Sequence, residues 1–137
     1  MIYLDTSALV KLYVREAFSE ELRQAVAGQA VRTVSIAFVE ALSAFARKAE
    51  LNDAERLAVT REFLKSWHRY RALATDGVLE TAGVLTRGHR LRAFDAVHLA
   101  AAMELGAPGG IQFAVYDKEL ARAAREEGFQ VITDPAY

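Results

Sequence analysis

The chain opens with MIYLDTSALVKLYV (residues 1–14), and this stretch predicts how the fold begins. Met1 to Leu4 is a short apolar run that favours a buried strand. The polar residues 5–7 (Asp-Thr-Ser) end that run with side chains that cap helices, so we expect a helix from Ala8 to Val14. Val31 to Ile36 carries the β-branched residues of a second strand, so the first unit is predicted to be β-α-β.

Helical and strand patterns alternate along the rest of the chain. A buried-strand pattern at Ile111 to Tyr116 follows a Gly/Pro-rich break, and Phe129 to Thr133 is typical of a last strand. This alternation predicts an α/β fold with helices on both faces of a central parallel sheet of four to five strands. The expected helices are Phe18 to Val26, Ala37 to Ala49, Asn52 to Tyr70, Val78 to Thr86, Phe94 to Leu105 and Asp117 to Glu127.

Composition limits the classes of protein to consider. The 137 residues, 53% of them hydrophobic, suit a single domain over residues 1–137, and a net charge of −1 argues against binding nucleic acid by bulk positive charge. The absence of cysteine excludes disulfides and thiolate sites and fits a reducing cytoplasm, so any metal must take oxygen or nitrogen ligands. No targeting segment and no apolar run of membrane-spanning length is visible, so we expect no membrane association.

Four carboxylates stand beside or within apolar sequence: Asp5, Glu40, Asp95 and Asp117. An unpaired buried carboxylate costs several kcal/mol, so such groups reach solvent, cap a helix, become protonated or gather around a cation. The three aspartates each stand before a helical window, so helix capping is an equal alternative for any one of them. Glu40 is expected inside a helix, where its alternative is an exposed helix face.

Two of these acids fall at the predicted carboxyl ends of strands. Because the carboxyl ends of parallel strands share one edge, Asp5 and Asp117 can meet there although they are far apart in the sequence. Clustered carboxylates repel one another unless hard cations neutralise them, and oxygen ligands suit Mg²⁺ or Mn²⁺. An acidic site that binds such cations indicates phosphoryl chemistry.

The four acids also lie in motifs that resemble the acidic motifs of PIN domains. In length and layout the chain is similar to the VapC toxins of VapBC toxin–antitoxin pairs, and the resemblance runs in order from residue 3 to about residue 133. The motifs are Tyr-Leu-Asp-Thr-Ser-Ala-Leu-Val-Lys-Leu-Tyr (3–13), Phe-Val-Glu-Ala-Leu (38–42), Phe-Asp-Ala-Val-His-Leu-Ala-Ala-Ala (94–102) and Val-Tyr-Asp-Lys-Glu-Leu-Ala (115–121).

The resemblance implies a PIN-like three-layer α/β/α fold and a Mg²⁺-dependent endoribonuclease, with Mn²⁺ as a possible substitute. The enzyme would be the toxin of a type II pair, cleaving RNA phosphodiesters by metal-activated water and silenced by a VapB-type antitoxin. A homodimer is also implied. Asp5 and Asp95 would be the main metal ligands and Glu40 and Asp117 would complete the catalytic site.

The resemblance further implies that Thr6 or Ser7 orients Asp5 or a bound water. Many relatives carry a Thr or Ser two residues before the last acid, whereas this chain has Val115, so a hydroxyl contact beside Asp117 is lost.

Several alternatives stay open from the sequence. The protein could be a PIN-like module that binds RNA or protein without cleavage. His98, three residues after Asp95, could form a metal pair with it on one helix face. Residues 61–92 carry seven Lys or Arg against three acids, which suits either an RNA contact or a solvated helix face. Trp67 and Tyr70 could stack on bases or belong to the core.

Overall fold

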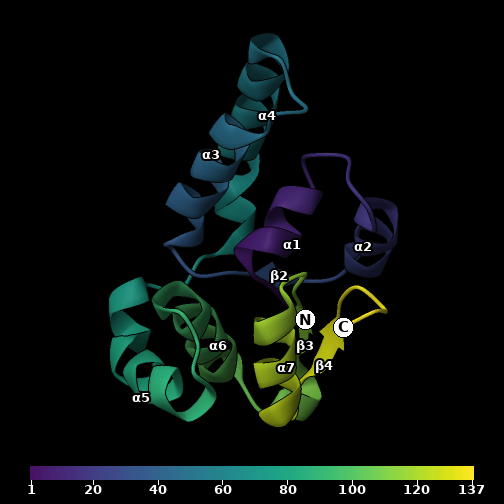
Figure 1. Cartoon of the computed structure of the whole chain (residues 1–137). Helices are drawn as coiled ribbons and strands as arrows, with labels where there is room; N and C mark the ends of the chain where they lie inside the picture. The colour runs from purple at the N-terminus through teal and green to yellow at the C-terminus, as the bar shows by residue number, and fades with distance from the viewer.

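A four-stranded parallel sheet lies at the centre of the protein, whose computed structural model describes all residues 1–137. The strands are β1 (Ile2–Leu4), β2 (Val31–Arg32), β3 (Gln112–Ala114) and β4 (Gln130–Ile132), in the order β2-β1-β3-β4 (Figure 1). In register, Ile2 of β1 lies opposite both Val31 of β2 and Gln112 of β3. The predicted parallel sheet is therefore confirmed, with β1 and β3 at its middle.

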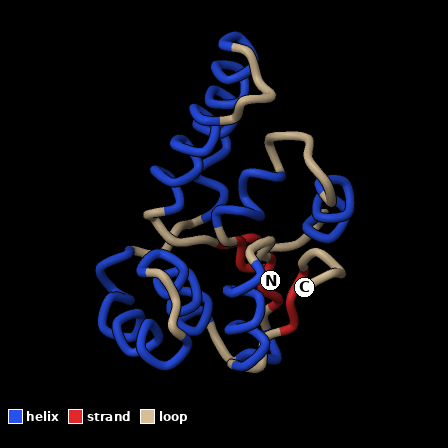
Figure 2. The backbone as a smooth tube through the Cα atoms, viewed as in Figure 1, coloured by secondary structure: helices blue, strands red, loops and turns tan.

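Helices pack on both faces of the sheet and give the predicted three-layer α/β/α arrangement (Figure 2). One face carries α1 (Thr6–Lys11), α2 (Ser19–Val26), α3 (Ala37–Arg47) and α4 (Asp53–Ser66). The other carries α5 (Leu79–His89), α6 (Ala93–Leu105) and α7 (Lys118–Glu126). Short 3₁₀ turns span Trp67–Tyr70, Thr75–Val78 and Pro108–Gly110. None of the helices combines the length and apolar character that a bilayer span requires.

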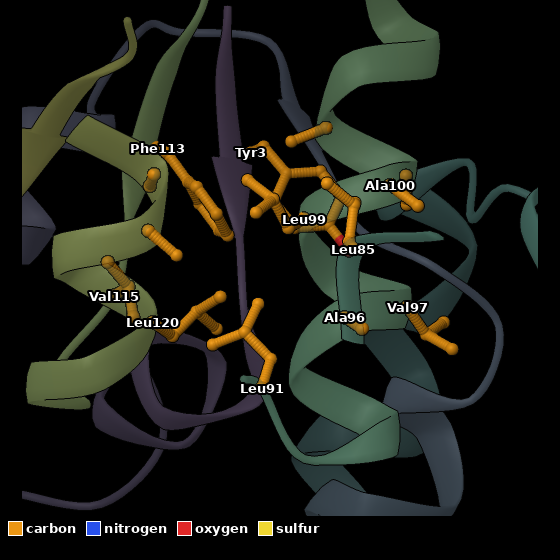
Figure 3. Close-up of a cluster of buried hydrophobic side chains, with 14 of the residues drawn as sticks. Tyr3, Leu85, Leu91, Ala96, Val97, Leu99, Ala100, Phe113, Val115 and Leu120 are labelled. Atoms are coloured by element: carbon orange, nitrogen blue, oxygen red, sulfur yellow. The ribbon is translucent and has the colours of Figure 1, made fainter. Parts of the chain in front are cut away.

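Alternating side chains of the central strands build the two cores. Ile2 and Leu4 point into the core formed with α1 to α4, whereas Tyr3 points into the core formed with α5 to α7. Figure 3 shows Tyr3 and Phe113 on the second side, with Tyr3 beside Leu99 of α6. Burial on both faces explains why β1 reads as a continuous apolar run in the sequence.

Helices α3 and α4 form an antiparallel hairpin that projects from the body of the molecule (Figure 1). Asn52 and Glu55 close a reciprocal capping box at the start of α4. Phe63 is fully buried against Phe45 and Trp67, and Tyr70 is also buried. Of the two sequence readings for Trp67 and Tyr70, core packing is therefore the one that the structure supports.

Three basic residues on α4 and the 3₁₀ turn after it face solvent. Arg61, Lys65 and Arg69 are exposed and take part in none of the ion pairs of the structure. This exposure fits both readings, an RNA contact and a solvated helix face.

Several predicted boundaries were wrong, most clearly in three elements. The strand expected over 31–36 ends at Arg32, because β1 gives way to α1 after Leu4 and the following residues pair instead with Leu73. The first helix begins at Thr6, where the Asp5 cap starts it, and ends at Lys11. The helix expected to reach Tyr70 becomes a 3₁₀ turn after Ser66.

Candidate active site

The structure places the four predicted acids at the carboxyl edge of the sheet and on the helices beside it. Asp5 follows β1, and Asp117 lies just beyond β3 at the start of α7. Glu40 and Asp95 lie in the first turns of α3 and α6. Hydrogen bonds hold each of the four carboxylates in place.

Asp5 is the most deeply buried of the four, with 4% of its surface exposed. One carboxylate oxygen, Oδ1, accepts hydrogen bonds from the Ala8 amide at 2.9 Å and from the Ser7 hydroxyl at 2.7 Å. Ser7 in turn accepts a hydrogen bond from the Tyr116 amide at 2.8 Å, which ties the end of β1 to the residue before Asp117. Burial raises the pKa of Asp5 to about 6, against 3.8 for an ordinary Asp.

Glu40 is half-buried and hydrogen-bonded on its Oε1 atom. The Thr6 hydroxyl and the Nε2 atom of His98 each lie 2.8 Å from that oxygen. Burial alone would raise the pKa of Glu40, but the contacts with His98 and Thr6 outweigh it and hold the pKa below its usual range. Glu40 therefore lies inside a helix, as predicted, and its half-buried carboxylate contacts Thr6 and His98, so the alternative of an exposed helix face was wrong.

His98 links Glu40 to the interior of the sheet. Its Nδ1 atom lies 2.8 Å from the Tyr3 hydroxyl, and its side chain is buried within α6. Because the ionised Glu40 carboxylate can only accept, Nε2 carries the hydrogen between them. With both ring nitrogens engaged, His98 does not form the metal pair with Asp95 that was one reading of their spacing.

Asp95 and Asp117 are joined by one guanidinium group. Nε of Arg92 donates to Asp95 at 3.0 Å and its terminal nitrogen donates to Asp117 at 3.3 Å. Burial raises the pKa of Asp95, although Arg92 acts in the opposite direction. Asp117 also caps α7 by accepting from the Leu120 amide, whereas Asp95 lies inside the first turn of α6 and caps nothing, so the capping alternative was wrong for Asp95.

The supporting hydroxyls divide between two acids. Ser7 orients Asp5 as the sequence suggested, while Thr6 donates to Glu40 instead. Val115 is fully buried in the core beside α6 and α7, so no hydroxyl reaches the site from that position.

Sequence reasoning missed the roles of Tyr3 and Arg92. A tyrosine in a strand that is buried on both faces needs a partner for its hydroxyl, which was a usable signal for Tyr3. For Arg92, the signal was its position three residues before Asp95, within reach on one helical turn.

The donor chemistry of the site fits a hard divalent cation. As the side chains stand, no three His, Asp or Glu side chains are arranged to hold a metal ion. Arg92 instead supplies positive charge between two of the carboxylates, and its side chain is 79% exposed, so it can move aside without opening the core. Carboxylate oxygens are ligands that Mg²⁺ and Mn²⁺ prefer, so the residue types at the site fit such a cation.

Comparisons with known proteins point in the same direction. The family model described as PIN domain matches residues 2–126. Ribonuclease VapC45 of Mycobacterium tuberculosis is 35% identical over 136 residues, which cover 96% of this chain and 94% of the relative. Ribonuclease VapC46 of the same species is 37% identical over 132 residues, with 96% and 95% covered.

Solved structures share the fold. FitAcB from Neisseria gonorrhoeae aligns with a TM-score of 0.68 at 17% identity, covering 100% of this chain and 99% of the other. VapBC2 from Rickettsia felis, bound to a DNA fragment from their promoter, aligns with a TM-score of 0.64 at 14% identity, covering 98% and 99%.

Proposed function

This chain belongs to the PIN-domain family, and we propose that it is a metal-dependent endoribonuclease acting as the toxin of a type II toxin–antitoxin pair. The observation that carries the proposal is the match, over 96% of the chain, to relatives named as VapC ribonucleases. The structure supports the proposal with four carboxylates at one edge of the sheet, each of which is hydrogen-bonded to specific partners.

Asp5 and Asp95 would be the main ligands of Mg²⁺ or Mn²⁺, with Glu40 and Asp117 completing the site. When bound, a divalent cation supplies charge stabilisation at phosphate oxygens and lowers the pKa of water. The residues of the chain supply orientation: Ser7 and the Ala8 amide fix Asp5, while Thr6 and His98 fix Glu40. Such partners typically matter for metal affinity because they hold each ligand in one rotamer.

The reaction is in-line attack of water on a phosphodiester of RNA. The oxygen of water forms the new bond to phosphorus, and the bond from phosphorus to the 3′ oxygen breaks. The products are a 5′-phosphate and a 3′-hydroxyl, and the pentacovalent transition state gains negative charge that the acidic site can stabilise only when cations are present.

An antitoxin of the VapB type is the proposed partner, and the protein is proposed to form a homodimer. The structural neighbours FitAB and VapBC2 are both bound to DNA fragments. The projecting α3–α4 hairpin carries exposed apolar side chains suited to a protein contact, namely Val39, Leu57 and Leu64.

The test is cleavage of RNA by protein freed of any co-purifying partner, with Mg²⁺ or Mn²⁺ titrated in and then chelated by EDTA. We expect cleavage with the metal, none after chelation, and none from Asp5→Asn. An Asp5→Asn variant that still cleaves would sink the assignment, because contaminating nuclease or another site would then be responsible.

A second candidate is a PIN-like module that binds RNA or protein without cleavage. The bridge from Arg92 to Asp95 and Asp117 favours it, because that bridge occupies carboxylates that a metal would need. Wild-type protein that binds RNA but fails to cut it at every Mg²⁺ and Mn²⁺ concentration would establish this function instead.

A further inference from the structure

A hollow of about 330 Å³ opens beside the acidic site, between α1, α3 and Tyr116. Thr6 and Ser7 form part of its lining, and these are the residues that donate to Glu40 and Asp5. The hollow is therefore adjacent to the carboxylates but contains none of the four.

Two lysines supply the charge of this hollow. Lys11, at the end of α1, has only 10% of its side chain exposed, and Lys48, just after α3, has 25% exposed. Both ammonium groups pair with the same carboxylate, Glu16, at 3.2 and 2.8 Å. The Lys11 ammonium also lies 4.8 Å from the centre of the Tyr116 ring.

One carboxylate cannot neutralise two ammonium groups. Burial would raise the pKa of Glu16, but Lys48 and Lys11 lower it below the usual range, so Glu16 is ionised at neutral pH. The three side chains together keep one uncompensated positive charge in a partly enclosed hollow. A buried ammonium is costly without a full partner, and a phosphodiester carries the one negative charge that balances the cluster.

The position of the hollow indicates which phosphate it suits. It shares Thr6 and Ala44 with a second hollow of about 390 Å³ that is lined by Glu40 and the exposed Phe94. The two hollows therefore adjoin one another beside α3. Glu40 lines one of them and the two lysines line the other, so neighbouring phosphates of one RNA strand can reach both.

We propose that this hollow binds a backbone phosphate of single-stranded RNA, with Lys11 and Lys48 as its ligands, next to the phosphate that lies at the acidic site. The inference rests on the proposed function and adds to it a subsite for the substrate. Lysine suits the role because it binds phosphate as a point charge. Glu16 holds both ammonium groups in place when no RNA is bound.

The experiment measures binding of short fluorescein-labelled poly(U) in an Asp5→Asn background, across about 50 to 200 mM salt. Lys48→Gln should weaken binding several-fold and lower the slope of log affinity against log salt by about 0.7, the value for one contact to a single strand. Glu16→Gln should do the opposite and tighten binding, because it frees positive charge. Arg125→Gln, which removes a positive charge near the far end of α7, is the matched control and should change neither affinity nor slope by a comparable amount.

The opposite effects of Lys48→Gln and Glu16→Gln on RNA affinity distinguish a phosphate-binding site from a purely structural ion pair. Removing either partner of a purely structural pair changes binding in the same direction, through stability, and thermal melts of each variant measure that contribution. Lys11→Gln provides a second variant if Lys48→Gln fails to fold. Equal slopes for all variants, a common direction for Lys48→Gln and Glu16→Gln, or no salt-dependent binding would each overturn the subsite.

A further outcome would show that the hollow binds a partner protein instead of RNA. If Lys48→Gln weakens antitoxin binding and leaves RNA binding unchanged, the hollow binds an acidic side chain of the partner and the proposal is wrong. The proposed function fails separately: wild-type protein that cuts no RNA refutes cleavage, even where the salt slopes behave as expected.

Discussion

The two halves of the acidic site differ in how their carboxylates are held. Asp5 and Glu40 are fixed by interior groups, including Ser7, Thr6 and the buried His98. Asp95 and Asp117 share one largely exposed guanidinium, that of Arg92. One half is preorganised by the fold, while the other is held by a cation that is open to solvent.

Substitution of one acid in each half should give the largest effect and the clearest contrast. Asp5→Asn should lower the rate of RNA cleavage at least about a hundredfold, because loss of even an outer partner of a metal ligand costs roughly 10 to 100-fold. Asp117→Asn should lower it less, since that carboxylate lies at the exposed margin. Asparagine keeps a helix cap at both positions, so thermal melts should change little. Equal losses would show that the two halves do not differ.

Two substitutions of His98 each remove one of its hydrogen bonds, either to Tyr3 or to Glu40. His98→Gln keeps an N–H for Glu40, whereas His98→Asn is shorter and keeps a partner only for Tyr3. We expect His98→Asn to lower kcat by about 10 to 100-fold and His98→Gln to retain more activity, as measured at saturating RNA. If both variants lose stability equally and retain the same kcat, His98 is structural and does not position Glu40.

The buried carboxyl of Asp5 should make the stability of the metal-free protein depend on pH. Its pKa is about 6 in the folded state against 3.8 as the ordinary value, so the folded state binds the proton more tightly. The resulting stability is fully present below pH 3.8 and is lost as pH rises towards 6, an effect of at most about 3 kcal/mol. Denaturation by urea from pH 4 to 7 checks this sign.

Asp5→Asn is the control for that titration, because it removes the carboxyl and keeps the cap. The difference between wild type and variant isolates the contribution of Asp5 from that of other groups. A difference that does not change between pH 4 and 6 would contradict the raised pKa. Addition of Mg²⁺ at pH 7 should stabilise wild type and leave Asp5→Asn nearly unchanged.

Removal of the guanidinium in the exposed half should give the smallest effect. Arg92→Gln frees Asp95 and Asp117, so we expect Mn²⁺ affinity to rise several-fold in calorimetric titration. Its effect on stability should stay within about 1 kcal/mol, because the Arg92 side chain is largely exposed. A fall in Mn²⁺ affinity would show that Arg92 supports the site and does not compete with the cation.

Local sequence patterns predicted much of the scaffold. The apolar run before Asp5 predicted a buried strand, and the polar residues after it predicted a helix start, since both signals act within a few residues. Family membership was confirmed, and the predicted parallel sheet with helices on both faces was correct. Metal binding by the four acids remains a prediction.

Contacts between residues that are far apart in the sequence could not be predicted in the same way. The hydrogen bond between Tyr3 and His98 joins residues 95 positions apart, and the bridge from Arg92 to Asp117 joins residues 25 apart. Strand β2, which begins at Val31, is shorter than predicted for a related reason. Its length depends on how far β1 continues beside it. No pattern within a single element contains that information.

The sequence by itself determined which residues carry charge beside apolar segments, and therefore which acids needed an explanation. Only the tertiary structure decided that Asp5 and Glu40 are fixed from the interior while Asp95 and Asp117 share a solvent-exposed guanidinium. The physical reason is that the free-energy cost of burying a carboxylate can be inferred from its residue type and from its apolar neighbours along the chain. Hydrogen bonds require donor and acceptor within about 3 Å, a distance that only the folded chain sets.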